Sequence, residues 1–273
     1  MSKIENMGQK LMKELRVQGF VPTPADENDE IVRDLWESEK RIRNMTQHSA
    51  WSGDTPRILR ALPGFIDHTL LKPDATEAHV RVLCEEAIVH QFASVCVNSR
   101  YVPLCREFLD HSSVAVCTVV GFPLGANASD AKSYETEWAV NQGATEVDMV
   151  IPVGSIKSGH YLNAAKDVQA VTQAARPHAL VKVIIETCLL THEEKVNACL
   201  IARAAGAHFV KTSTGFSTQG ATVEDVRLMR QIVGATMGVK ASGGVRDFET
   251  AMHMIYSGAS RIGASAGVSI VSG

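Results

Sequence analysis

The sequence lacks the patterns that mark several common protein classes. Its longest apolar stretch, residues 114–126, is far shorter than the roughly 20 residues that span a bilayer, and two glycines and a proline interrupt it. The first ten residues contain no apolar core of the kind found in a secretory signal. No dense run of lysine and arginine offers a surface to nucleic acid or to an anionic membrane. We therefore expect neither a membrane protein nor a nucleic-acid-binding one.

Paired cysteines and histidine metal motifs are also missing. The six cysteines form no Cys-x-x-Cys pair and lie mostly within apolar runs. This usage is typical of reduced thiols, so we expect a cytoplasmic protein. The ten histidines show no His-x-His or His-Glu-x-x-His spacing, and no metal site is expected.

What is present is an ordinary globular composition. The chain has 273 residues, of which 45% are hydrophobic and 21% charged, and its formal net charge is −3. This length is sufficient for one barrel or for two smaller domains.

Residues 1–55 differ from the rest because they are charged and lack runs rich in valine and isoleucine. Apolar residues at helical spacing predict one helix over Lys3–Val17 and a second over Asn28–Met45. We interpret residues 1–55 as a helical N-terminal extension that packs on the body of the protein or on a neighbouring subunit. The division that follows is an extension over 1–55 and a single barrel over 56–273.

From Phe65 onward, eight short runs rich in β-branched residues alternate with segments of helical pattern. The predicted strands are Phe65–Thr69, Ala93–Val97, Val114–Gly121, Glu146–Ile151, Leu180–Thr187, His208–Thr212, Gly238–Ala241 and Arg261–Gly263. The predicted helices between them include Glu77–His90, Ala126–Asn141, Leu162–Ala175, Glu193–Ala205, Thr222–Val233 and Phe248–Ser257. Eight units at an even spacing of roughly 28 residues predict a (β/α)8 TIM barrel. A doubly wound sheet is the alternative, but no Gly-x-Gly-x-x-Gly turn follows the first strand.

Four predicted strands whose ends would form the mouth of such a barrel carry charged residues: Asp148, Lys182, Glu186, Lys211 and Lys240. Two ammonium groups on adjacent strands lower each other's affinity for a proton, and burial acts in the same direction. A neutral lysine amine attacks carbonyl carbons and forms Schiff bases. Asp148 would transfer protons in this chemistry, or it would simply pair with Lys182 or Lys211.

Glycines and small hydroxyl residues follow each of the last three predicted strands, at residues 212–215, 242–246 and 263–267. Glycine backbone groups at helix starts bind anions, and barrels commonly bind phosphate after strands seven and eight. We therefore predict a phosphorylated carbonyl substrate.

Together these motifs resemble those of the deoxyribose-phosphate aldolase family, in the same order along the chain. The resemblance extends from about Phe65 to Val271 and rests on Ile66–Leu71, Ala93–Val97, Val119–Gly125, Glu146–Ile151, Val181–Thr187, Val210–Phe216, Val239–Arg246 and Arg261–Ser265. It implies an aldolase without metal or cofactor that degrades deoxyribose phosphate. The reaction is the reversible cleavage of 2-deoxy-D-ribose 5-phosphate to D-glyceraldehyde 3-phosphate and acetaldehyde.

The resemblance also implies roles for individual residues. Lys211 would form the Schiff base, Lys240 would promote loss of the Lys211 proton, and Asp148 would act as acid and base. The residues implied to line the substrate site are Asp67, Thr69, Cys96, Lys182, Thr212, Gly215, Gly243, Gly244, Gly263, Ala264 and Ser265. For Cys96, packing is favoured over chemistry because no base is adjacent to it in sequence. Arg246 either contacts phosphate or points into the eighth unit.

The sequence departs from the family pattern at two places. Phe216 occupies a position where some members carry lysine, and few residues follow the last strand, so a catalytic C-terminal segment would be absent.

Two alternative functions stay open. They are another phosphate-binding Schiff-base aldolase and a sugar-phosphate-binding regulator without turnover. In each case the partners are small phosphorylated sugars and aldehydes, and we expect a homodimer or homotetramer.

Overall fold

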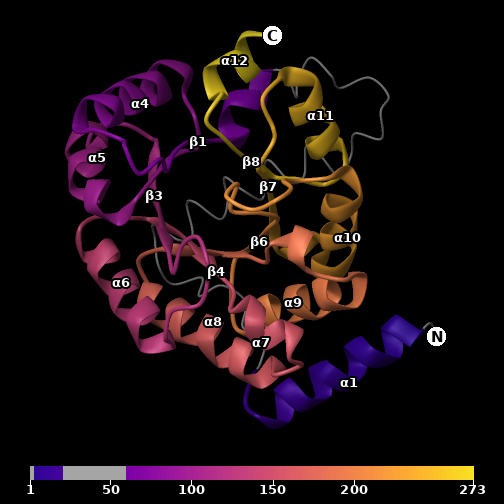
Figure 1. Cartoon of the computed structure of the whole chain (residues 1–273). Coiled ribbons are helices and arrows are strands. Elements are labelled where there is room, and N and C mark those ends of the chain that lie inside the picture. Colours follow the sequence, from indigo (N-terminus) through magenta and orange to yellow (C-terminus); the bar gives the residue numbers. More distant parts are fainter. Residues whose placement is uncertain (1–2, 21–59) are drawn as a thin grey trace.

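The computed structural model describes residues 3–20 and 60–273. Within these ranges, eight parallel strands form a closed barrel in sequence order, which Figure 1 shows with the helices arranged around it. The strands are β1 (Ile66–Leu70), β2 (Ser94–Val97), β3 (Ala115–Val120), β4 (Glu146–Val150), β5 (Leu180–Ile184), β6 (Phe209–Lys211), β7 (Gly238–Ser242) and β8 (Arg261–Ala264). Pairing of β1 with β8 closes the sheet, with Asp67 opposite Gly263. The predicted TIM barrel is confirmed, and the doubly wound sheet is excluded.

Helices between the strands cover the outside of the barrel. They are α4 (Glu77–His90), α5 (Val102–Leu109), α6 (Ser129–Asn141), α7 (Val153–Lys157), α8 (Tyr161–Ala175), α9 (His192–Ala204), α10 (Val223–Val233), α11 (Phe248–Tyr256) and α12 (Gly267–Ser272). Because these helices cover one face and the barrel interior the other, the strands are buried on both faces. All six residues of β3 are buried, for example.

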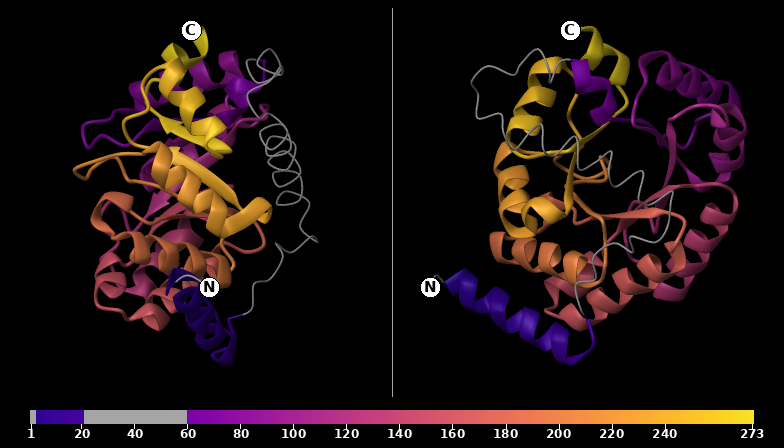
Figure 2. Two further views of the ribbon diagram at one scale, coloured as in Figure 1. Left: turned by 90° about the vertical axis from the view of Figure 1, so that its right-hand side faces the viewer. Right: turned by 180° about the vertical axis from the view of Figure 1, so that it is seen from behind.

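The N-terminal helix α1 (Lys3–Val17) matches the first predicted helix and lies outside the ring of barrel helices (Figures 1 and 2). It packs against α9, and Leu11 and Leu15 are buried. The second predicted helix, Asn28–Met45, lies outside the described residues. The division into an extension over 1–55 and a barrel over 56–273 therefore stays a prediction.

One boundary differs from the sequence prediction in a way that matters for the site. The strand predicted over Leu180–Thr187 ends at Ile184. Glu186 has a left-handed backbone (φ 54°), which is uncommon for a residue other than glycine. A short 3-10 helix, Thr187–Leu189, follows it. The backbone turn at Glu186 ends the strand, although the apolar pattern continues through Ile185.

No helix in the described part of the chain is both long enough and apolar enough to cross a membrane.

Candidate active site

The strand register brings the predicted lysines together. Lys211 on β6 lies opposite Lys240 on β7, and Asp148 on β4 lies opposite Lys182 on β5. All four side chains project into the barrel, where they meet other buried charges. We call the resulting group of seven residues the charge cluster: Asp67, Glu146, Asp148, Lys182, Lys211, Lys240 and Arg261.

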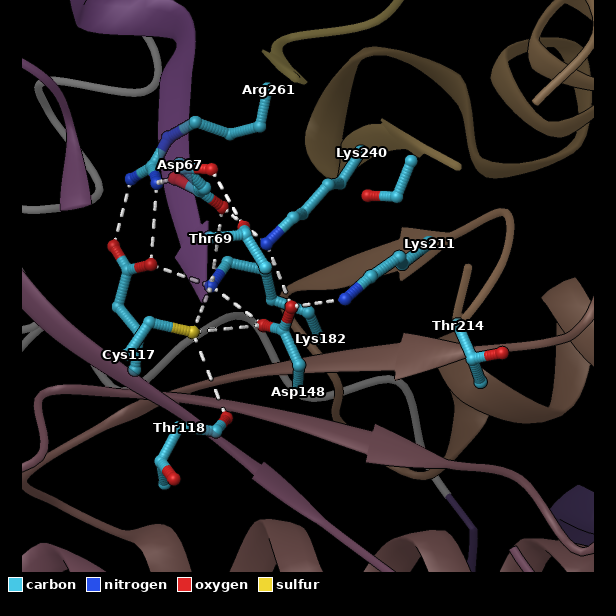
Figure 3. A network of polar contacts seen from close by, with 12 residues as sticks. Asp67, Thr69, Cys117, Thr118, Asp148, Lys182, Lys211, Thr214, Lys240 and Arg261 are labelled. Atoms are coloured by element: carbon cyan, nitrogen blue, oxygen red, sulfur yellow. Dashed lines mark hydrogen bonds and ion pairs between the residues drawn. The ribbon is translucent and has the colours of Figure 1, made fainter. Parts of the chain in front are cut away.

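Asp148 is the centre of the charge cluster. Its Oδ2 accepts hydrogen bonds from the Nζ atoms of Lys211 and Lys240, each at 2.7 Å. Its Oδ1 accepts one from Nζ of Lys182 at 2.8 Å. Figure 3 shows the three lysine nitrogens directed toward this one carboxylate. Because Lys211 and Lys240 share one oxygen atom, their nitrogens are separated by no more than twice the 2.7 Å bond length.

A second part of the charge cluster lies deeper in the barrel. Arg261 donates to Asp67 and, through Nη2 at 2.8 Å, to Oε1 of Glu146. Lys240 pairs with Asp67 at 2.5 Å, and Lys182 pairs with Glu146 at the same distance. No role was predicted from the sequence for Glu146 or Arg261. A charged residue within an otherwise apolar, buried strand is the signal that could have identified Glu146.

The charge cluster holds its carboxylates ionised. Burial raises the pKa of Asp148, but the ammonium groups of Lys182, Lys211 and Lys240 outweigh burial and hold that pKa well below its usual range. Burial likewise opposes ionisation of Asp67, yet Arg261, Lys240 and Lys182 lower its pKa. Asp148 is thus a carboxylate surrounded by donors.

For Lys240 the direction is opposite to the sequence expectation. Burial lowers its pKa, but Asp148 and Asp67 reverse this effect and raise the pKa well above its usual value. The pKa of Lys182 is also raised, because Asp148, Cys117 and Glu146 outweigh burial. The lysines lie near like charges, as expected, but the carboxylates around them have the larger effect on their pKa values. Lys240 and Lys182 are therefore permanent cations.

A cavity of about 410 Å³ lies at the carboxyl ends of the strands, next to the charge cluster. Eight of the residues predicted from the sequence line it: Thr69, Lys211, Gly215, Gly243, Gly244, Gly263, Ala264 and Ser265. Lys72, Ser242 and Arg246 line it as well. Of the three lysines bound to Asp148, Lys211 is the one that lines the cavity.

The other predicted residues are placed elsewhere. Asp67, Asp148, Lys182 and Lys240 belong to the charge cluster and are fully buried. The Thr212 hydroxyl donates to the carbonyl of Ser242 and accepts from its N–H, both at 3.0 Å, so it joins β6 to β7.

Cys96 packs in a small buried cluster with Leu71, Cys117 and Val119, in line with the interpretation of this residue as a packing residue. One ligand atom each of Cys96, Cys117 and Asp148 lies within 4.8 Å of the others. Both oxygens of Asp148 already accept from lysine ammonium groups at 2.7–2.8 Å. A metal ion here would have to displace these cations, which makes the geometry a poor metal site.

One end of the cavity is suited to an anion. Gly243 and Gly244 both have positive φ, 84° and 80°, and a side chain on Gly243 would lie 2.9 Å from the backbone of Gly220. Glycine thus allows the loops after β6 and β7 to approach each other with their backbone groups facing the cavity. Lys72 and Arg246 line the cavity, and neither has an ion-pair partner among the residues that the structure describes.

An aromatic contact forms part of the cavity wall. Phe216 lines the cavity and meets Phe122 edge to face, with ring centroids 5.2 Å apart. Phe122 follows β3 and Phe216 follows β6, so this contact joins loops from strands that are not neighbours. The cavity wall is therefore apolar at Phe216, the position at which some members of the family carry a lysine.

Comparisons with known proteins agree with this geometry. A domain described as "DeoC/LacD family aldolase" matches residues 64–273. The deoxyribose-phosphate aldolase of Clostridium tetani is 58% identical over 207 residues, which are 76% of this chain and 96% of that protein. The Brevibacillus brevis enzyme of the same name is 61% identical over 209 residues, covering 77% and 94%. The tetrameric deoxyribose phosphate aldolase structure from Aeropyrum pernix superposes with a TM-score of 0.75 at 32% identity, covering 85% of this chain and 95% of that one.

Proposed function

Since the chain belongs to the DeoC/LacD family of aldolases, we propose that it reversibly cleaves 2-deoxy-D-ribose 5-phosphate to D-glyceraldehyde 3-phosphate and acetaldehyde. The observation that carries the proposal is the position of Lys211. Its amine lines the cavity, 2.7 Å from the carboxylate of Asp148 and beside the buried cation Lys240.

The first stage is formation of a Schiff base. The neutral amine of Lys211 attacks C1 of the open-chain sugar, and the carbinolamine loses water to give an iminium ion. Asp148 receives and returns protons during this stage, acting with water in the cavity. Lys240 remains protonated and keeps a fixed positive charge beside the carboxylate of Asp148, to which both lysines donate.

The second stage cleaves the C2–C3 bond. A base removes the proton of the C3 hydroxyl, the C3–O bond becomes a carbonyl, and the C2–C3 electron pair moves to the iminium to form an enamine. D-Glyceraldehyde 3-phosphate leaves with C3 to C5. Protonation of the enamine at C2 and addition of water then release acetaldehyde and regenerate Lys211.

The substrate phosphate occupies the other end of the cavity. The backbone groups of Gly215, Gly243 and Gly244 surround it, and Lys72 and Arg246 contribute positive charge. This arrangement compensates for Phe216, because the charge that a lysine would supply there comes from two other cations on the cavity wall.

Two further features belong to the proposal. A cytoplasmic location is supported by the six free thiols, five of them buried. Assembly as a homodimer or homotetramer is supported by the Aeropyrum pernix relative, whose structure is described as tetrameric.

Reductive trapping tests the proposed chemistry. The protein is treated with acetaldehyde and borohydride, digested, and mapped by mass spectrometry. We expect an ethyl group on Lys211 and none in Lys211→Ala. Lys72→Met is the matched control, because Lys72 lines the same cavity, and this variant should still be labelled at Lys211. Labelling of Lys211→Ala as readily as the parent would contradict the assignment of the nucleophile.

The substrate is tested separately with 2-deoxy-D-ribose 5-phosphate. The expected result is release of D-glyceraldehyde 3-phosphate by the parent and loss of this release in Lys211→Ala. Labelling at Lys211 without release of D-glyceraldehyde 3-phosphate would support Schiff-base formation but contradict 2-deoxy-D-ribose 5-phosphate as the substrate.

A further inference from the structure

Ser242 is a cavity residue that the steps above do not use. It ends β7 and lies two residues after Lys240, so both side chains project from the same face of the strand. Its exposed fraction is 5%, and it lines the cavity. Its hydroxyl has no hydrogen-bond partner among the described residues. A buried polar group without a partner is costly, and because Ser242 also lines the cavity, a ligand bound there could supply the missing partner.

The neighbouring strand leaves room for this hydroxyl. Gly263 on β8 lies opposite Ser242. A Cβ atom at Gly263 would come within 2.3 Å of the Ser242 Oγ and 2.9 Å of the Lys240 side chain. The absence of a side chain at Gly263 thus leaves space for the hydroxyl between the charge cluster and the residues that line the cavity.

The backbone of Ser242 is held in place while its side chain has no partner. The Thr212 hydroxyl accepts from the N–H of Ser242 and donates to its carbonyl, both at 3.0 Å. Only the side-chain hydroxyl is left to contact a ligand. Such a pre-positioned group loses little freedom when it binds.

Ser242 lies between the residues that would bind C1 of the sugar and those that would bind its phosphate. Lys211, which would bind C1, is on the adjacent strand, and Gly243, which would contact the phosphate, is the next residue in the chain. Between these ends, the open-chain sugar carries hydroxyls on C3 and C4. The C3 oxygen is the reacting one and belongs near Asp148, so the C4 hydroxyl is the group left for Ser242.

We propose that the Ser242 hydroxyl forms a hydrogen bond with the C4 hydroxyl of the sugar phosphate, which is the C2 hydroxyl of the aldehyde product. Ser242 would then select phosphorylated aldehydes that carry a hydroxyl next to the carbonyl over those that lack it. This inference rests on the proposed function. A site built to pair with a hydroxyl discriminates against analogues without one, because its own polar group is then left unpaired.

The test uses the reaction in the direction of synthesis, with acetaldehyde as donor and two acceptors. D-Glyceraldehyde 3-phosphate carries the hydroxyl, and 3-oxopropyl phosphate has the same chain and phosphate without it. For Ser242→Ala we expect kcat/KM to fall about tenfold with the first acceptor, the loss of one hydrogen bond, and to change less than about twofold with the second.

Ser94→Ala is the matched control. Ser94 lies on β2, is fully buried, and also has an unpaired hydroxyl among the described residues, but it does not line the cavity. This variant should leave kcat/KM for both acceptors within about twofold of the parent, since it removes a buried serine hydroxyl of the same kind elsewhere in the barrel.

The outcomes separate a failure of the Ser242 inference from a failure of the proposed function. Equal losses with both acceptors in Ser242→Ala, or no loss with either, would overturn the assignment of Ser242. A parent protein that converts neither acceptor would overturn the proposed function itself and the Ser242 assignment with it. Failure of the proposed function is thus visible in the parent alone, and failure of the Ser242 inference only in the comparison of variants.

Discussion

At the scale of single residues, position distinguishes side chains of the same type. Three lysines donate to the carboxylate of Asp148, but Lys182 and Lys240 are fully buried and their pKa values are raised. Lys211 is the one of the three that lines the cavity. The same side chain thus serves as a fixed cation at two positions and is available to a carbonyl compound at the third.

Lys72 and Arg246 give a prediction about phosphate. Hydrogen bonds to charged groups contribute about 1.5–3 kcal/mol, so replacing either residue with methionine should raise KM for 2-deoxy-D-ribose 5-phosphate by about tenfold or more. The kcat/KM for unphosphorylated 2-deoxyribose should change less than about twofold, since this sugar has no group for either cation to bind. Steady-state kinetics of both variants with both sugars measure this. Equal losses with the two sugars would show that these side chains do not recognise the phosphate.

At the scale of the elements, one buried carboxylate connects the end of β5 to the loop after β6. Glu186 is 3% exposed and accepts from the Thr214 hydroxyl at 2.5 Å and from the Thr214 N–H at 3.3 Å. Thr214 immediately precedes Gly215 and Phe216, which line the cavity. The left-handed backbone of Glu186 directs its side chain toward this loop, as is common for strained residues near functional sites.

We therefore predict that Glu186→Gln loosens the loop. The amide oxygen of glutamine can still accept from the hydroxyl and N–H of Thr214, but these hydrogen bonds lose the negative charge that strengthens them, and the NH2 group in place of Oε1 cannot accept from the Thr214 N–H 3.4 Å away. The free energy of unfolding should therefore fall by about 1–2 kcal/mol. KM should rise more than kcat falls, because the loop holds the substrate rather than the reacting carbon. Urea unfolding and steady-state kinetics measure the two effects.

Glu249→Gln is the control for that variant. Glu249 is exposed on α11, and its replacement should change the free energy of unfolding by less than about 0.5 kcal/mol. A Glu186→Gln protein as stable as this control, with unchanged KM, would contradict the role assigned to Glu186.

The elements also show what sequence patterns can and cannot predict. The helix predicted over Glu77–His90 coincides with α4, because its apolar spacing and the cap at Thr76 are local properties. The turn at Glu186 was missed because β-branched residues continue beyond the point where the strand ends. For the candidate site, the positions of Lys211 and Lys240 at strand ends predicted side chains directed at the barrel mouth, and Asp148 was predicted to point inward. Partners such as Arg261 depend on the register of non-adjacent strands, which no local pattern contains.

At the scale of the whole molecule, the charge cluster makes stability depend on pH. The pKa values of Asp67, Glu146 and Asp148 are lowered in the folded protein. The unfolded chain therefore binds more protons in acid, and the stability from these groups is complete above about pH 5 and is lost as the pH falls. The raised pKa values of Lys182 and Lys240 affect stability in alkali. The stability that these two lysines contribute is lost only well above about pH 10.

The free energy of unfolding should accordingly be nearly constant between about pH 6 and 9 with respect to these groups, and should fall steeply below about pH 5. Urea unfolding at a series of pH values measures this curve. Each carboxylate that takes up a proton on unfolding adds about 1.4 kcal/mol per pH unit to the slope. A free energy that stays constant down to about pH 3 would contradict the lowered pKa values.

The charge cluster is also divided by sign along the chain. β1 and β4 supply its three carboxylates, whereas β5 to β8 supply its four cations, one from each strand. Cut between β4 and β5, the barrel would give one half with only acidic and one with only basic cluster members. Neither half could neutralise its interior, since buried charges without partners are strongly unfavourable. Within the charge cluster each half thus supplies the opposite charges that the other half lacks, which makes the two halves complementary fragments.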